Sequence, residues 1–182
     1  EMLGRVKKLN TKSVVLARLA AAMTAVHDNR APFFVNELLT LIETQKIDFQ
    51  RLRMQSEYAK YLVLSQQTQK ALSVIQSCKK GCEELRSPRM KLDIVATLID
   101  CYAMLGKLEA ALACSGLVPE LYRDKVVAVA VESALVSKRF ADATALAPLI
   151  VHPRYKLQIT SLAIGNFIQG NLHTALSILG WL

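Results

Sequence analysis

The residues in this sequence whose types and spacing could support chemistry are four cysteines and three histidines. Cys78 and Cys82 stand four residues apart, so a helix that continues past Gly81 would carry both thiols on one face, as a metal pair or a vicinal dithiol requires. The chain has no second cysteine pair at zinc spacing, and no histidine lies near this pair. We therefore predict no metal and no cofactor, and we interpret the cysteines at 78, 82, 101 and 114 as reduced, packed thiols of a cytoplasmic protein.

The sequence contains no recognisable catalytic motif. A nucleophilic Ser or Cys needs a base and an orienting partner, and a phosphate site needs a glycine-rich turn that enters a helix. The chain has no Gly-x-Ser-x-Gly, no Gly-x-x-x-x-Gly-Lys and no His-Glu-x-x-His. The histidines at 27, 152 and 173 lie beside breaks between helices, where a histidine commonly caps a helix or faces water. We predict that the protein has no catalytic residues and is not an enzyme.

The charge balance is basic, with 23 Lys and Arg against 15 Asp and Glu and a formal net charge of +8. An acidic protein, a nucleic acid and an anionic surface all fit that charge. The densest basic segment runs from 79 to 91 and contains Lys79, Lys80, Arg86, Arg89 and Lys91. A nucleic-acid surface usually adds exposed aromatic side chains, for which the tyrosines at 58, 61 and 122 are candidates, although tyrosine at helical spacing more often packs half-buried.

Apolar residues recur at intervals of three and four along most of the 182 residues, and no long stretch alternates apolar and polar side chains. This pattern predicts an all-α protein. We expect breaks at 28–32, 66–68, 79–88, near 106, around 119, near 138, around 153 and at 170–171, which leave helices of about 10 to 16 residues. Polar residues interrupt the most apolar stretch, 157–182, so we predict no membrane span.

One short pattern repeats along the chain. In residues 102–112 the end of an expected helix is followed by Gly106, one polar residue and Leu108, and then, after two more residues, by Ala111 and a leucine. Residues 167–176 have the same pattern, and related segments occur at 66–72 and 137–143. The alanines at 71, 111, 143 and 175 are separated by 40, 32 and 32 residues. A glycine after a helix can take the left-handed cap, an apolar residue two positions later seats the second helix, and a small alanine lets the two helices of a hairpin approach closely. Hairpins repeated in this way stack into a solenoid.

The repeated unit resembles the tetratricopeptide repeat (TPR), with Tyr102, Gly106, Leu108 and Ala111 as the best match. The resemblance covers residues 53–182. It departs from the family in its spacing of 32, against about 34 in that family, in Lys138 at the glycine position, and in alanine 134 and asparagine 166 at the aromatic position. It implies one α-α superhelix of about four to five hairpins, with helices of unclear repeat at 1–52 and TPR-like hairpins at 53–88, 89–122, 123–155 and 156–182.

The resemblance also implies a concave groove lined by the first helix of each hairpin. The positions that correspond to partner-contacting ones in such repeats are Arg53, Ser56, Lys60, Val63, Asp93, Ala96, Asp100, Ala103, Lys125, Ala128, Glu132, Leu135, Thr160, Ile164 and Phe167. A groove of this kind has mixed charge and becomes more apolar toward the carboxyl end. It suits an amphipathic helix or an extended peptide with a few apolar anchors. The alternative is that several of these residues are simply solvated or packed against the neighbouring first helix.

The carboxyl end of the sequence is strongly apolar. Residues 157–182 contain no Asp, Glu, Lys or Arg, and the last apolar side chains are Leu176, Leu179, Trp181 and Leu182. A solenoid normally closes with a polar capping helix, so we expect either that the native chain continues or that a partner covers this end. A second copy of the chain is one such partner, which gives a homo-oligomer.

These observations favour a non-catalytic protein–protein interaction module, a right-handed array of hairpins that acts as an adaptor, a chaperone or an assembly scaffold. It would hold a polypeptide in the groove or dock through the apolar end. The alternative is an RNA-binding helical repeat, in which the basic residues converge on one face and affinity falls steeply with salt. The carboxylates at 93, 100 and 132 favour the first hypothesis, because they would place negative charge in the middle of the groove.

Overall fold

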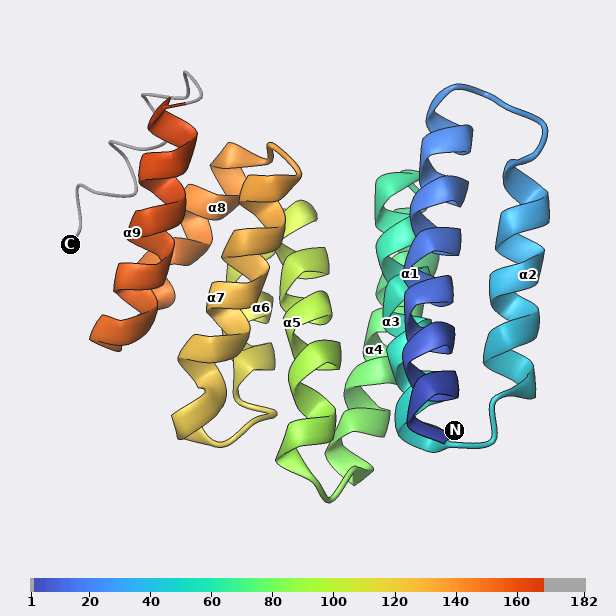
Figure 1. Cartoon of the computed structure of the whole chain (residues 1–182), viewed down its shortest axis with the longest axis horizontal. Helices are drawn as coiled ribbons and strands as arrows, with labels where there is room; N and C mark the ends of the chain where they lie inside the picture. The colour runs from blue at the N-terminus through green and yellow to red at the C-terminus, as the bar shows by residue number, and fades with distance from the viewer. Residues whose placement is uncertain (1, 169–182) are drawn as a thin grey trace. The chain divides into compact units, whose positions relative to one another are not determined.

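The computed structural model describes the backbone of residues 2–168 and the side chains of residues 11–162, 164 and 165. This part of the chain contains nine α-helices, one 3₁₀ helix and no strand (Figure 1). The prediction of an all-α protein is confirmed. The chain divides into two compact units, residues 1–94 and residues 95–182.

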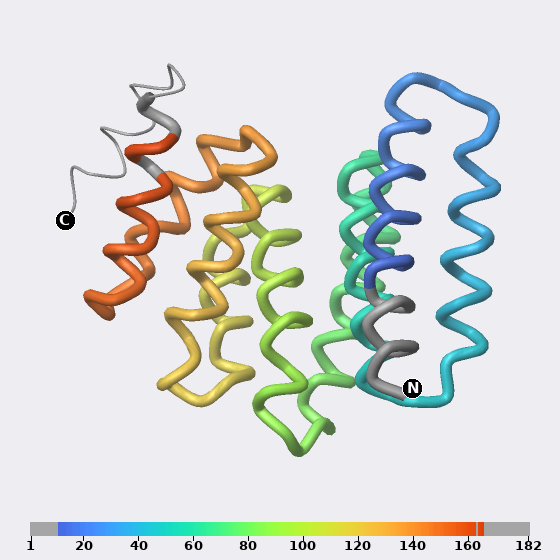
Figure 2. Tube along the Cα trace, viewed as in Figure 1, coloured from blue at the N-terminus to red at the C-terminus, as the bar shows by residue number. Residues whose placement is uncertain are grey.

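The first unit contains helices α1 (Met2–Ala25), α2 (Ala31–Thr44), α3 (Asp48–Leu64) and α4 (Thr68–Glu84), together with the start of α5 (Pro88–Met104). Helices α1 and α2 run antiparallel (Figure 2), α1 also packs against α3, and α3 packs against α4. The apolar residues at three-and-four spacing supply one connected core. Its buried members are Leu16, Ala17, Ala20, Leu38, Ile42, Met54, Tyr61, Leu62 and Ala71.

The second unit contains the rest of α5 and helices α6 (Leu108–Ser115), α7 (Glu120–Val136), α8 (Phe140–Leu146), a 3₁₀ turn at Ala147–Leu149, and α9 (Pro153–Ile168). Helix α7 packs against α6, α8, the 3₁₀ turn and α9. It is rich in alanine and valine, which let neighbouring helices approach on several sides. Its buried residues are Val126, Val127, Ala128, Ala130, Val131, Ala134 and Leu135.

The same turn ends four of the helices. Backbone φ is 54° at His27, 60° at Gln66, 68° at Gly106 and 58° at Lys138, which places all four residues in the left-handed region. In each case the next residue donates its N–H to the carbonyl five positions earlier, at 2.8 to 2.9 Å. This is the hydrogen bond of the Schellman motif, which satisfies carbonyls left free at a helix end. Lys138 therefore adopts the same left-handed backbone conformation as Gly106.

The repeated alanines also share one environment. Ala71, Ala111 and Ala143 are each the fourth residue of a helix that follows such a turn, and all three are fully buried. Each donates its N–H to the carbonyl of the residue just before its helix, at 2.9 to 3.1 Å. Three copies of the repeated pattern thus have the same local structure, whereas Ala175 lies outside the described residues.

Two expected boundaries differ from the structure. The break predicted from 79 onward is wrong at its start, because α4 continues through Gly81 to Glu84. Gly81 is a packing position: a Cβ there would lie 2.5 Å from a Cδ atom of Leu52 on α3. A larger residue would push α4 away from α3 or force Leu52 to move. Helix α3 also begins at Asp48, so it crosses the boundary expected between 52 and 53.

Candidate functional sites

An apolar pocket lies in the second unit, between α6, α7 and the segment that enters α9. Its volume is about 530 Å³. Three large apolar side chains surround it and remain open to solvent: Leu112 is 52% exposed, and Leu121 and Val151 are each 77% exposed. Leu121 lies in the first turn of α7, after Pro119, and Val151 lies in the short segment before Pro153. Exposed apolar side chains gathered around a pocket are typical of a surface that contacts another molecule.

Hydrogen bonds that one carboxylate accepts hold this pocket in shape. Asp124 on α7 accepts the N–H of Val151 at 3.0 Å and also the N–H of His152, so it fixes the entry to α9 against α7. The carboxylate lies at the amino end of α9, where the helix dipole favours negative charge. His152 in turn accepts the N–H of Arg154 on Nδ1 at 3.2 Å. The charged residues Glu120, Arg123 and Asp124 also line the pocket, so its edge carries both signs.

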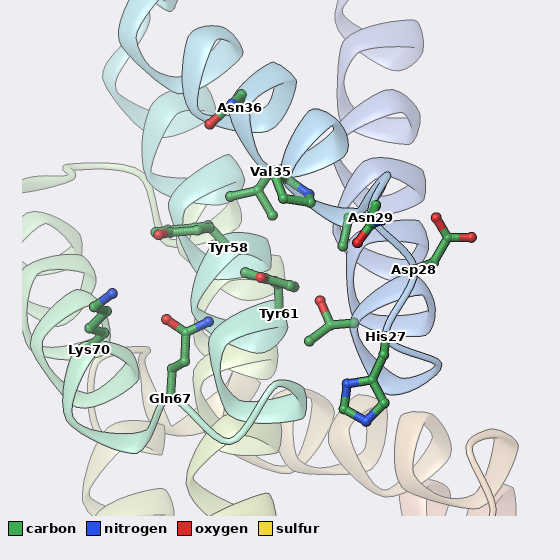
Figure 3. Close-up of a pocket in the computed structure, with 12 residues that line it drawn as sticks. His27, Asp28, Asn29, Val35, Asn36, Tyr58, Tyr61, Gln67 and Lys70 are labelled. Atoms are coloured by element: carbon green, nitrogen blue, oxygen red, sulfur yellow. The ribbon is translucent and has the colours of Figure 1, made fainter.

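A polar pocket of about 630 Å³ lies in the first unit, where the α1–α2 turn, α2, α3 and the start of α4 meet. Figure 3 shows Tyr58 and Tyr61 on one side of α3, with Gln67 next to the rings and Lys70 to their side. The two rings stack with their centroids 6.0 Å apart and an angle of 21° between their planes. The packing interpretation of these tyrosines is confirmed, since Tyr61 is buried in the core and Tyr58 packs against it.

The carboxylate that lines this polar pocket is already engaged. Asp28 accepts the backbone N–H of Arg30 at 2.9 Å, its Nε at 3.0 and 3.2 Å, and its Nη2 at 2.7 Å. These hydrogen bonds from Arg30 lower the pKa of Asp28 to about 2. In Figure 3 the carboxylate points away from the tyrosines. Asp28 and Arg30 thus neutralise each other at the edge of the pocket.

A buried ionic cluster lies in the core of the second unit. Asp100 on α5 is 1% exposed, accepts a hydrogen bond from Ser133 Oγ at 2.9 Å and forms an ion pair with Arg139. Arg139 also binds Asp142 at 2.7 Å. A buried carboxylate is tolerated when a cation and hydrogen bonds compensate its lost hydration. This cluster ties α5 and α7 to the turn before α8.

The structure separates the predicted groove residues into two groups. Six are buried inside the chain: Ser56, Ala96, Asp100, Ala103, Ala128 and Leu135. Eight are exposed or half-buried: Arg53, Lys60, Val63, Asp93, Lys125, Glu132, Thr160 and Ile164. The side chain of Phe167 and the apolar end at Leu176, Leu179, Trp181 and Leu182 lie outside the described residues.

Burial changes the expected charge of the groove. Asp100 was expected to add negative charge to the groove, but it is buried and paired with Arg139. Asp93 forms an ion pair with Arg53 at 2.9 Å. Two of the three carboxylates that favoured a polypeptide over RNA therefore have cationic partners. Their charge no longer separates the two hypotheses.

All four cysteines are free and buried, so the interpretation as packed thiols is confirmed. Burial is the main reason that the pKa of Cys82 rises to about 11, and a thiol with so high a pKa is a poor nucleophile and a poor metal ligand at neutral pH. Among the described residues, no group of three or more His, Cys, Asp or Glu could hold a metal ion.

Neither pocket was predicted as a site from the sequence. Tyr58 and Tyr61 were candidates for base stacking or packing, whereas Leu112, Leu121 and Val151 were not among the candidate residues. The available signal for the apolar pocket was the pair of prolines at 119 and 153, each two positions from an apolar residue, Leu121 or Val151. An apolar residue in that position either packs inward or stays open to solvent, and only the structure separates these outcomes.

Comparisons with models of protein families, with curated proteins and with solved structures give no match. Within residues 2–168, none of the helices combines the length and the apolar character needed to cross a membrane. The function must therefore be inferred from the chain's own residues.

Proposed function

We propose that this protein is a non-catalytic protein–protein interaction module built from TPR-like hairpins, which stack as a right-handed α-α superhelix. It would act as a cytoplasmic adaptor, chaperone or assembly scaffold. The recurrence of one turn and one buried alanine supports this proposal, because a repeated hairpin with the same closing geometry is the unit from which such arrays are built. The chain from 53 onward provides the repeats, and residues 1–52 add amino-terminal helices.

The observation that carries the proposal is the apolar pocket with Leu112, Leu121 and Val151 exposed around it. Leaving three large apolar side chains in water is unfavourable, and covering one of them contributes about 1.5 to 3 kcal/mol to binding. A partner helix or extended segment would insert one apolar side chain between α6, α7 and α9. Asp124 keeps the walls in place, so little ordering is needed when the partner binds.

The eight groove residues that are exposed or half-buried remain candidates for contact with the same polypeptide. Lys125 and Glu132 supply charges along α7, and Ile164 supplies an apolar contact on α9. Docking through the apolar end, including by a second copy of the chain, also remains a prediction.

The proposal can be tested with a library of random twelve-residue peptides selected on the purified protein. We expect enriched peptides to carry one large apolar residue, and we expect Leu121→Asp or Val151→Asp to weaken their binding about tenfold or more, since each places a charge at the pocket. Val136→Asp is the matched control, because Val136 is 73% exposed and does not line the pocket. Failure to enrich any peptide, or equal effects of all three variants, would count against the proposal.

Measuring the mass of the protein in solution by light scattering, at low and high salt, tests the alternative that it binds RNA. A protein that retains its peptide or its partner copy at high salt supports an apolar docking surface. A monomer that carries nucleic acid and releases it as salt rises would favour the RNA-binding alternative, because phosphate contacts weaken steeply with salt.

A further inference from the structure

The polar pocket of the first unit is lined by a largely buried tyrosine, Tyr61, whose hydroxyl has no hydrogen-bond partner among the described residues. Tyr61 is 6% exposed, lines the pocket, and has ring stacking with Tyr58 as its side-chain interaction among the described residues. A tyrosine hydroxyl without a protein partner is available to bind water or a ligand in the pocket that it lines. Tyr58 adds a second hydroxyl on the same side of α3 (Figure 3).

The charges around this pocket favour an anion. Lys70 lines it, and the lining carboxylate, Asp28, is neutralised by Arg30. Helix α4 begins beside the pocket, has 17 residues, and starts without a side-chain cap at Gln67. The amino end of a helix of that length carries partial positive charge and free N–H groups. One lysine and one helix end together supply about 1.5 positive charges, enough to neutralise a singly charged anion but not a doubly charged one.

The rest of the lining favours an apolar body attached to that anion. Ala31, Pro32 and Val35 line the pocket together with the two tyrosines. A cavity of about 630 Å³ lies in the size range of roughly 300–1,000 Å³ that is typical of small-molecule sites. The amides of Asn36 and Gln67 provide further polar groups for orientation.

We propose that this pocket binds a singly charged carboxylate carried on an aromatic or apolar body. Lys70 and the first turn of α4 bind the carboxylate, the hydroxyls of Tyr58 and Tyr61 donate to its oxygens, and the apolar body lies against Val35 and the tyrosine rings. Burial, and then the neighbouring Tyr61, raises the pKa of Tyr58, so this hydroxyl keeps its proton at neutral pH. The site belongs to the first unit and shares no lining residue with the pocket proposed for polypeptide docking, so it does not depend on that function.

The test is a two-dimensional ¹H–¹⁵N NMR titration of the whole chain with benzoate, benzamide and phenyl phosphate. We expect benzoate to shift the amides of residues 58–61 and 67–71 saturably, with a Kd on the order of 1 mM. Benzamide has the same ring without the charge and should bind about tenfold more weakly. Phenyl phosphate should bind no better than benzoate. Equal binding of benzamide, tighter binding of phenyl phosphate, or no saturable shift in this region would overturn the proposal.

Two variants locate the effect within the pocket. Lys70→Met removes the charge and keeps an apolar stem, and Tyr61→Phe removes one oxygen. Each should weaken benzoate binding about fivefold or more. Lys46→Met and Tyr122→Phe make the same chemical changes outside the pocket and should leave the Kd unchanged. Because both pocket variants preserve side-chain shape, their circular dichroism should match that of the parent. Normal benzoate binding by both pocket variants would contradict the assignment.

A third arm identifies the source of the carboxylate. N-acetylphenylalanine is compared with a six-residue peptide that ends in phenylalanine, as the free acid and as the amide. Tighter binding of the peptide acid than of N-acetylphenylalanine would assign the site to the carboxyl terminus of a polypeptide, and equal binding would assign it to a small organic acid. Binding of the peptide amide as tight as that of its acid would overturn the role of the carboxylate.

Discussion

Replacing Lys138 with glycine is expected to stabilise the protein by about 0.5 to 1 kcal/mol. Lys138 has a φ of 58° and an exposed side chain, so the change removes backbone strain without removing a buried contact. The left-handed region raises the free energy of a residue that has a Cβ by about 1 to 2 kcal/mol. Glycine has more conformational entropy in the unfolded chain, and this offsets about 0.5 to 1 kcal/mol of the stabilisation gained by removing the strain. Gly106→Ala is the reverse change, and since a Cβ at 106 would meet nothing within 4 Å, its expected loss of similar size comes from the backbone alone.

The assay is urea unfolding followed by circular dichroism at the helical band. Lys125→Gly is the matched control, because Lys125 is exposed in the interior of α7 in the same unit. Glycine in a helix interior costs about 1 kcal/mol, so the same Lys-to-Gly change should lower the urea midpoint at 125 and raise it at 138. A fall of similar size at both positions would refute the left-handed assignment and, with it, the equivalence of the Lys138 and Gly106 turns.

The structure leads to three further expected outcomes. Asp100→Ala should lower the free energy of unfolding by about 2 to 4 kcal/mol, because it leaves Arg139 largely buried without its main partner; unchanged stability in urea would show that the ion pair contributes nothing. Cys82 and the other buried thiols should react with a thiol reagent at pH 8 no faster than local or global unfolding exposes them. Fast labelling of the native protein would contradict their burial. The pKa of Asp28, about 2 in the native protein, should rise toward 3.8 in Arg30→Gln. Since this pKa is lowered by folding, its contribution to stability is present above the unfolded value and is lost as pH falls toward 2, which NMR titration of the carboxyl can check.

Much of the secondary structure could be predicted because the signals are local. The apolar period of three and four marks the helices, and the repeated turn is visible because Gly106 and its counterparts each stand five positions before an alanine. Gln66 and Lys138 adopt the same left-handed turn as Gly106, so the surrounding pattern identified the turn even without glycine. The break expected at Gly81 failed for a physical reason, since that glycine serves contact with Leu52 and not chain reversal.

The candidate sites were harder to predict because they depend on contacts distant in sequence. Asp100 looked like a groove residue, and its burial depends on Ser133 and Arg139, which lie 33 and 39 positions later. The apolar pocket requires Asp124 to hold the backbone at 151 and 152. The apolar periodicity of the sequence does not indicate a hydrogen bond between residues so far apart in the chain. Position on a helix face is local information, whereas exposure is decided by what packs on that face.

The contact between Gly81 and Leu52 has a consequence for how this sequence can evolve. A side chain at 81 and a full leucine at 52 compete for the same space between α3 and α4. A side chain at 81 therefore fits most readily when the residue at 52 is smaller, and otherwise Leu52 must turn its methyl groups away. Among relatives of this chain the two sites should covary, with a shorter residue at 52 wherever 81 is not glycine. The pair would then serve as an evolutionary marker of the α3–α4 packing.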